Sequence, residues 1–133
     1  MPENLSDSLL LAVVGAHLSG MPLNHQLTDL GAVLAEETTT AAAYRLYDLG
    51  TAPPKPGLIR DPGGTAIVVE VWRLGLEEFA RFVDGLTSPM AIGHVELADG
   101  RWVNGFVVEP CAVASAIDIT SYGGWRPYQM AVS

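Results

Sequence analysis

The fold class is decided by the stretch Ala66-Ile67-Val68-Val69-Glu70-Val71-Trp72, which is followed closely by Leu76-Glu77-Glu78-Phe79-Ala80-Arg81-Phe82-Val83-Asp84-Gly85. The first segment is rich in β-branched residues, which is typical of a buried strand. The second places Leu76, Phe79 and Val83 on one helical face, and it has glutamates in its first turn and a glycine at its end. This pattern predicts an amphipathic helix. A strong strand followed by a strong helix indicates a domain that contains both.

Further strands are expected on both sides of this pair. Residues 92–97 and 102–109 flank Asp99-Gly100, a dipeptide that between two strands favours a β-hairpin. The whole pattern predicts an α+β fold, a small mixed β-barrel with one or two flanking helices. The remaining expected segments are strands over residues 9–14, 32–40, 43–49 and 113–120, a weak helix over 23–30, an extended proline-rich loop over 51–57 and an irregular tail over 121–128.

The length and the charge exclude several classes of protein. A chain of 133 residues is the size of one domain, and we expect a short tail over residues 1–8 and a single domain over 9–133. The net charge of −8 argues against a nucleic-acid partner. The apolar runs are too short to span a membrane, so we expect a cytoplasmic protein. Because 49% of the residues are hydrophobic and only 17% are charged, we also expect an apolar patch for self-association or a partner.

Neither cysteine nor histidine chemistry predicts a metal site. The single cysteine, Cys111, follows a proline in an apolar stretch, and we expect a buried and inert thiol. The three histidines, His17, His25 and His94, share no spacing typical of metal ligands. We interpret His25 and His94 as ordinary surface or edge residues.

His17 is the strongest candidate for chemistry. It lies in the loop Gly15-Ala16-His17-Leu18-Ser19-Gly20-Met21-Pro22, directly after the expected strand over 9–14. Loops of this kind can direct several backbone N–H groups at one anion. An imidazole beside them can exchange a proton near neutral pH. The structural alternative is a histidine that only bonds a neighbouring carbonyl.

Three other charged residues each have a functional and a structural interpretation. Glu70 interrupts the most apolar strand, where it is either paired with an arginine or an acid–base group. Lys55, the only lysine, is fixed between two prolines and either holds an anion or is solvated. Arg126 lies among glycines and aromatic residues, where it either stacks on a ring or clamps a carboxylate.

The segment Leu11-Ala12-Val13-Val14-Gly15-Ala16-His17-Leu18-Ser19-Gly20-Met21-Pro22-Leu23-Asn24 resembles the opening of the C-terminal domain of allophanate hydrolase. That domain has the gamma-glutamylcyclotransferase-like fold, so the resemblance implies a small mixed β-barrel with flanking helices. The similarity continues through Tyr44-Arg45-Leu46-Tyr47, Pro54-Lys55-Pro56-Gly57-Leu58, Glu70-Val71-Trp72, residues 93–100 and 103–106, Asp118-Ile119-Thr120 and Gly123-Gly124-Trp125-Arg126.

The resemblance implies that His17 is a catalytic residue. In allophanate hydrolase, an amidase-type domain removes ammonia from allophanate, and the C-terminal domain is implied to decarboxylate the product, N-carboxycarbamate. A protonated imidazole near the nitrogen can assist the loss of CO2 as a general acid. No metal, flavin or nicotinamide cofactor is expected. The implied binding groups for the small anionic substrate are the backbone N–H groups of Gly15, Ala16 and Leu18, with Lys55 or Arg126 adding charge.

Two other functions stay open. The chain has no amidase machinery of its own, so it is expected either to decarboxylate the product of a separate amidase, or to act on a similar small N-carboxylated anion as its new substrate. The first alternative is that it serves a separate amidase as a docking or oligomerisation module. The second alternative is a cyclotransferase with Glu70 or Asp84 as the base. Cyclotransferases carry Tyr-Gly-Ser-Leu in the first loop and a glutamate after the main helix, whereas this chain has Val14-Gly15-Ala16-His17 and no glutamate over residues 83–88.

Overall fold

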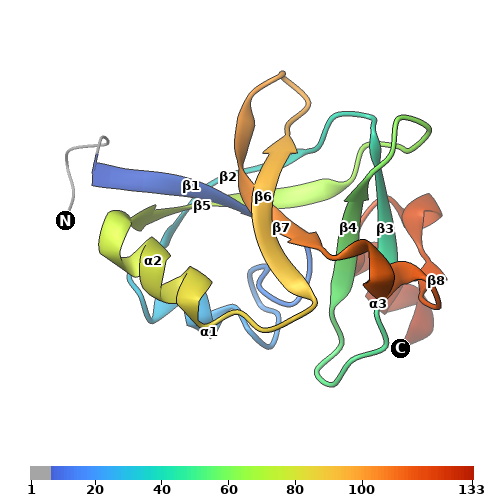
Figure 1. Ribbon diagram of the computed structural model, residues 1–133, viewed down its shortest axis with the longest axis horizontal. Helices are drawn as coiled ribbons and strands as arrows, with labels where there is room; N and C mark the ends of the chain where they lie inside the picture. Colours follow the sequence, from blue (N-terminus) through green and yellow to red (C-terminus); the bar gives the residue numbers. More distant parts are fainter. Residues whose placement is uncertain (1–6) are drawn as a thin grey trace.

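The computed structural model describes residues 7–133, which form two β-sheets and three α-helices (Figure 1). The strands are β1 (Ser8–Val13), β2 (Val33–Thr39), β3 (Tyr44–Asp48), β4 (Pro56–Arg60), β5 (Val68–Gly75), β6 (Met90–Glu96), β7 (Trp102–Val108) and β8 (Ile117–Asp118). The helices are α1 (His25–Thr28), α2 (Leu76–Asp84) and α3 (Trp125–Val132), with short 3-10 turns η2 (Pro110–Val113) and η3 (Thr120–Tyr122).

The larger sheet has the strand order β2-β5-β1-β7-β6. Strand β5 pairs antiparallel with both β2 and β1, and β1 pairs parallel with β7. The sheet is therefore mixed, and β5 is an interior strand whose Val69 and Val71 are fully buried. This placement explains why the stretch over 66–72 is so apolar. The middle strand is β1, whose end leads straight into the loop that carries His17.

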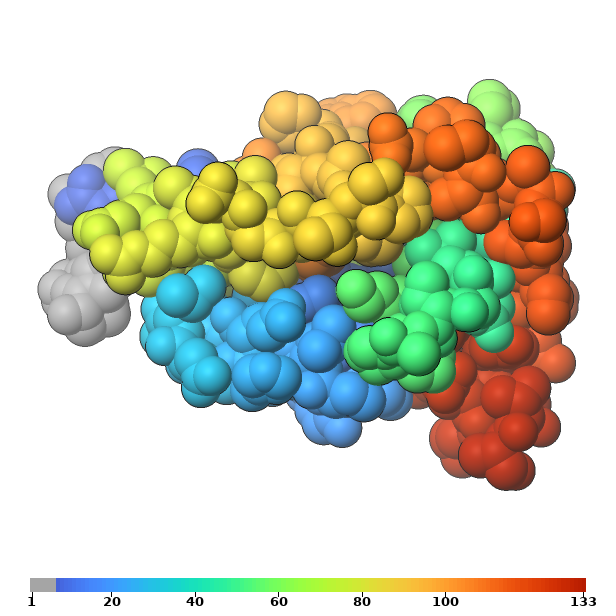
Figure 2. Space-filling view, turned by 60° about the horizontal axis from the view of Figure 1, so that its bottom comes forward, coloured from blue at the N-terminus to red at the C-terminus, as the bar shows by residue number. Residues whose placement is uncertain are grey.

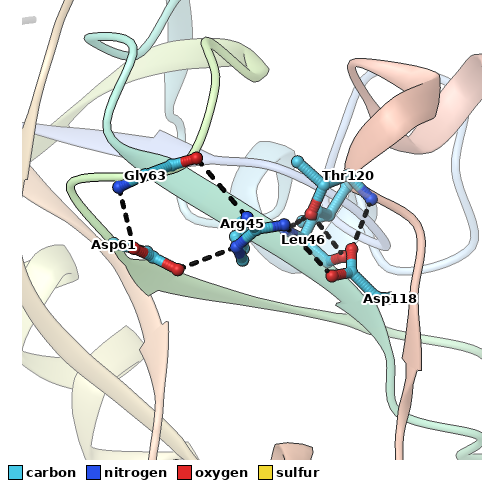
Figure 3. A network of polar contacts seen from close by, with 6 residues as sticks. All are labelled: Arg45, Leu46, Asp61, Gly63, Asp118 and Thr120. Carbon is cyan, nitrogen blue, oxygen red and sulfur yellow. Dashed lines mark hydrogen bonds and ion pairs between the residues drawn. The ribbon is translucent and has the colours of Figure 1, made fainter.

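The smaller sheet, with the order β4-β3-β8, is tied together by a polar network around Arg45 (Figure 3). The Arg45 guanidinium donates to Asp61 at 2.7 Å and to Asp118 at 3.3 Å. Thr120 donates its backbone N–H to Asp118 at 2.9 Å, and its side-chain oxygen accepts the N–H of Leu46 at 2.9 Å. These bonds attach the segment before α3 to the small sheet.

Most of the expected elements are confirmed. The α+β class, the hairpin of β6 and β7 around Asp99-Gly100, and the helix α2 all lie where their sequence patterns predict. Helix α2 packs on β1 and β5 and buries Phe82. The weak helix expected over residues 23–30 is the short α1.

Two expectations about the remaining segments are wrong. Residues 113–120 form no long strand: η2 begins at Pro110, and only the two residues of β8 pair with β3. The tail over 121–128 is not irregular, because it contains η3 and most of α3. Helix α3 tolerates Pro127 because a proline in the first turn replaces an N–H that has no partner within the helix. Strand β4 begins directly after Lys55 and is not predicted from the sequence, because prolines at positions 53, 54 and 56 precede or begin it.

Cys111 is exposed, so the expectation of a buried thiol is also wrong. The residue lies in the surface turn η2, which has no buried residues. Of the tail expected over residues 1–8, residues 1–6 lie outside the described part of the chain, and Ser8 already begins β1. Among the helices of residues 7–133, none has the length and apolar character that crossing a membrane requires.

Candidate functional site

The loop that carries His17 lies against the start of β4 because residue 15 is a glycine. A Cβ atom at Gly15 would lie 2.1 Å from Cδ of Pro56, a distance that two carbon atoms cannot adopt. The missing side chain therefore allows the loop and the proline to touch. Because Lys55 directly precedes this proline, the contact also brings the lysine to the loop, although Lys55 comes 40 positions after Gly15 in the sequence.

The imidazole of His17 is held in one orientation by its neighbours. It stacks on Phe106 of β7, with ring centroids 4.9 Å apart and planes inclined by 18°. Phe82 of α2 meets it edge-on at 5.3 Å. Its Nε2 lies 2.7 Å from the Oε1 atom of Gln26 in α1. With two aromatic contacts and a hydrogen bond, the residue is only 7% exposed.

His17 lines a cavity of about 170 Å³. Figure 2 shows how the segments around it meet on one face of the molecule: the yellow α2 and the chain after it lie above the blue loop and α1, with the green segment before β4 beside them. The cavity is lined by Val14, Gly15, Ala16, His17, Leu23, Gln26, Lys55, Pro56, Gly85, Leu86, Thr87, Met90 and Phe106.

The electrostatics of the cavity suit an anion. Burial lowers the pKa of His17, the hydrogen bond that the ring makes to the Gln26 oxygen opposes this change, and the nearby positive charge of Lys55 lowers the pKa further. Without an anion beside it, the His17 imidazole is therefore neutral at pH 7. Among residues 7–133, Lys55 has no ion-pair partner, although the chain as a whole carries a charge of −8. No Asp or Glu is among the residues that line the cavity.

Backbone N–H groups are also available at the cavity. Those of Gly15, Ala16 and His17 have no hydrogen-bond acceptor within the described part of the chain, and all three residues line the cavity. The N–H of Leu18 differs, because it donates to the Gly15 carbonyl at 2.9 Å. Leu18 does not line the cavity, so its expected role in holding a carboxylate is not supported by its position.

Arg126 and Glu70 also lie outside this cavity. One guanidinium nitrogen of Arg126, Nη2, donates to the Ser19 carbonyl at 2.6 Å and to Oε2 of Glu70 at 3.0 Å. Oε1 of Glu70 accepts the N–H of Ser19 at 2.8 Å, its Oγ–H at 3.0 Å and the indole N–H of Trp72 at 3.1 Å. Arg126 is therefore not among the residues that line the cavity with His17. Its carboxylate partner is Glu70, and the pair holds the loop that carries His17.

Comparison with known proteins identifies the family. A model of the allophanate hydrolase C-terminal domain matches residues 9–130. The chain belongs to this family. Urea amidolyase of Saccharomyces cerevisiae is 41% identical to it over 129 residues, which are 92% of this chain and 7% of the yeast protein. The family domain is thus a small part of a much longer protein in that relative.

Solved structures agree with the family assignment. Allophanate hydrolase of Kluyveromyces lactis superimposes with a TM-score of 0.92 at 37% identity, over 95% of this chain and 22% of that one. A uropathogenic E. coli-specific protein, c4763, matches with a TM-score of 0.86 at 36% identity, over 92% of this chain and 96% of its own. A gamma-glutamyl cyclotransferase shares only the fold, with a TM-score of 0.56 at 11% identity.

Several residues around His17 carry no signal in the sequence that would select them. Gln26 lies nine residues after His17 in a weakly patterned segment, and only its contact with the ring gives it a role. Phe82 and Phe106 look like ordinary core residues in α2 and β7. His25 and His94, interpreted as surface residues, are both exposed. Residues 7–133 contain no cluster of three or more residues that could hold a metal ion.

Proposed function

We propose that this domain removes CO2 from a small N-carboxylated dianion, N-carboxycarbamate, with His17 as the general acid. The observation that carries the proposal concerns one small cavity that no carboxylate lines. It holds a buried histidine together with a lysine and three N–H groups that have no partner among residues 7–133. The volume, about 170 Å³, is below the usual range of roughly 300–1,000 Å³ for drug-sized ligands. A substrate of a few heavy atoms with two negative charges suits both features.

The two ends of the dianion have different partners in this proposal. The N–H groups of Gly15, Ala16 and His17 bind one carboxylate, as oriented backbone amides do at other anion sites. The ammonium of Lys55 faces the other end of the substrate. The Gly15–Pro56 contact holds the backbone next to Lys55 against the loop, so the two groups stay close to each other.

The chemical step breaks one C–N bond of the substrate. The electron pair of that bond goes to nitrogen, one carboxylate leaves as CO2, and the His17 imidazolium gives its proton to the nitrogen. The products are CO2 and carbamate, and the neutral imidazole regains a proton from water. General-acid assistance of this kind contributes about 10²- to 10⁴-fold in rate.

His17 gains its proton from solution when the substrate binds. Burial keeps the imidazole neutral at pH 7 when no substrate is bound. A dianion beside the ring favours the charged form and raises the pKa of His17. Binding therefore takes up a proton from solution. Because burial lowers the pKa of His17 in the free protein, kcat/KM falls as the pH rises through this lowered pKa.

The proposed substrate requires an amidase that supplies it. The relatives named allophanate hydrolase and urea amidolyase are much longer than this chain. We propose that a separate amidase-type protein makes N-carboxycarbamate from allophanate and that this domain consumes it. Use of Glu70 or Asp84 as a cyclotransferase base finds no support, because Glu70 is bound to Arg126 and neither carboxylate lines the cavity.

The test measures CO2 release when the purified domain is added to an amidase that is converting allophanate. The wild-type domain is expected to accelerate CO2 release above the spontaneous rate. His17→Gln is expected to reduce this acceleration by about 10²-fold or more. His94→Gln changes an exposed histidine on β6 and serves as the matched control. A folded His17→Gln variant with wild-type activity contradicts the mechanism, and a wild-type domain without any acceleration contradicts the function.

A further inference from the structure

The contact between His17 and Gln26 constrains the position of the ring proton. The Gln26 atom that faces the imidazole is the carboxamide oxygen, which accepts hydrogen bonds but cannot donate them. At 2.7 Å the Nε2 atom must therefore carry a hydrogen, in the neutral ring as well as in the imidazolium. Only Nδ1 remains to change its protonation state.

We infer that Gln26 is a positioning residue, which fixes His17 as the Nε2–H tautomer and thereby makes Nδ1 the nitrogen that transfers the proton to the substrate. This inference rests on the proposed function and adds to it the identity of the acidic atom. Gln26 acts through His17, and the proton itself never passes through the carboxamide.

The surrounding structure holds the plane of the ring and disfavours an exchange of its two nitrogens. Stacking on Phe106 and the edge contact of Phe82 hold the plane of the ring. Asn24 donates its side-chain N–H to the His17 carbonyl at 2.9 Å, so the same segment that carries Gln26 also holds the histidine backbone. A ring that turned over would lose the bond to Gln26 and leave the carboxamide oxygen without its partner.

A neutral partner suits a histidine that must donate a proton. The charged and titratable groups that act on His17 are Lys55 and His25, and both disfavour the imidazolium. A carboxylate at position 26 would oppose them and hold the proton more firmly. The carboxamide orients the ring as a carboxylate does, yet it adds no negative charge. At pH 7 the imidazolium is therefore favoured when the anionic substrate is present.

The experiment compares Gln26→Leu and Gln26→Glu with the wild-type domain, and Thr28→Ala in the same short helix is the control. Nitrogen-15 NMR of the His17 ring reports the tautomer of the empty protein without any substrate. Wild type is expected to show protonated Nε2 and unprotonated Nδ1 at high pH. Gln26→Leu is expected to give a mixture of tautomers and about a tenfold lower kcat. Gln26→Glu is expected to keep the tautomer and to move the His17 titration and the falling limb of the rate profile to higher pH.

The two proposals fail in different ways. An Nδ1–H tautomer in the wild type, or a Gln26→Leu protein with an unchanged tautomer and rate, overturns the role of Gln26. If the tautomers behave as expected but no variant, wild type included, accelerates CO2 release, the proposed decarboxylation is wrong and the tautomer assignment stands. Thr28→Ala is expected to match the wild type in both measurements, because Thr28 does not line the cavity.

Discussion

Replacing Arg126 by methionine tests how the loop of His17 is held in place. Arg126 bonds both the Ser19 carbonyl and Glu70, and Glu70 is only 3% exposed. The substitution keeps much of the apolar volume of the side chain but removes its charge and donors. It leaves a buried carboxylate without a counter-charge and a carbonyl without its partner.

The magnitude follows from the burial of the two partners. Breaking a fully buried ion pair from one side costs about 3–5 kcal/mol. Here the arginine side chain is 35% exposed, and Glu70 keeps the donors of Ser19 and Trp72. We therefore expect a loss of about 2–3 kcal/mol in the free energy of unfolding. For a domain of this size, that is a fall in Tm of about 8–12 °C.

Urea unfolding followed by tryptophan fluorescence is a suitable assay, because Trp72 bonds Glu70 and Trp125 precedes Arg126 in α3. Arg81→Met is the control: its pair with Glu77 is exposed on both sides, and its removal should cost less than about 0.5 kcal/mol. The double variant with Glu70→Gln should recover part of the loss, since the buried charge is then gone. Equal stabilities for the two arginine variants would refute the idea that this pair fastens the loop.

Four further outcomes are expected. Lys55→Met should raise the pKa of His17, as measured by NMR titration, and weaken malonate binding about tenfold in calorimetry; unchanged values would remove Lys55 from the site. Because the folded state lowers the pKa of His17, stability should be complete above about pH 6.5 and decrease as the pH falls through the lowered pKa, and His17→Gln should lose this dependence in urea titrations at pH 7.5 and 5. Gly15→Ala should destabilise the domain by about 1–3 kcal/mol through its collision with Pro56, and a wild-type Tm would contradict that contact. Cys111 should react with a thiol reagent in the native protein nearly as fast as in the unfolded chain, whereas strong protection would contradict its exposure.

The elements that sequence patterns predict well are those with a local cause. Asp99-Gly100 sets the hairpin of β6 and β7, and the spacing of Leu76, Phe79 and Val83 sets α2. Elements that depend on distant partners are harder to predict. Strand β8 exists only because Asp48 and Tyr47 of β3 lie beside it.

The site divides in the same way. His17 can be selected from its glycine-bounded loop, because the loop chemistry is local. Lys55 lies at the cavity because Gly15 and Pro56 are in contact, and the spacing of residues along the sequence does not predict this contact. The sequence leaves open whether Arg126 clamps a substrate carboxylate, and in the folded chain its carboxylate partner is Glu70, which lies 56 positions away along the sequence. Only the folded chain decides which charges remain unpaired.

A crystal structure of the domain with malonate tests the central claim most directly, because malonate carries two carboxylates at a spacing close to that of the proposed substrate. The account predicts malonate in the His17 cavity, with one carboxylate on the N–H groups of Gly15 and Ala16 and the other paired with Lys55. Malonate bound only at other places, with this cavity empty, would contradict it.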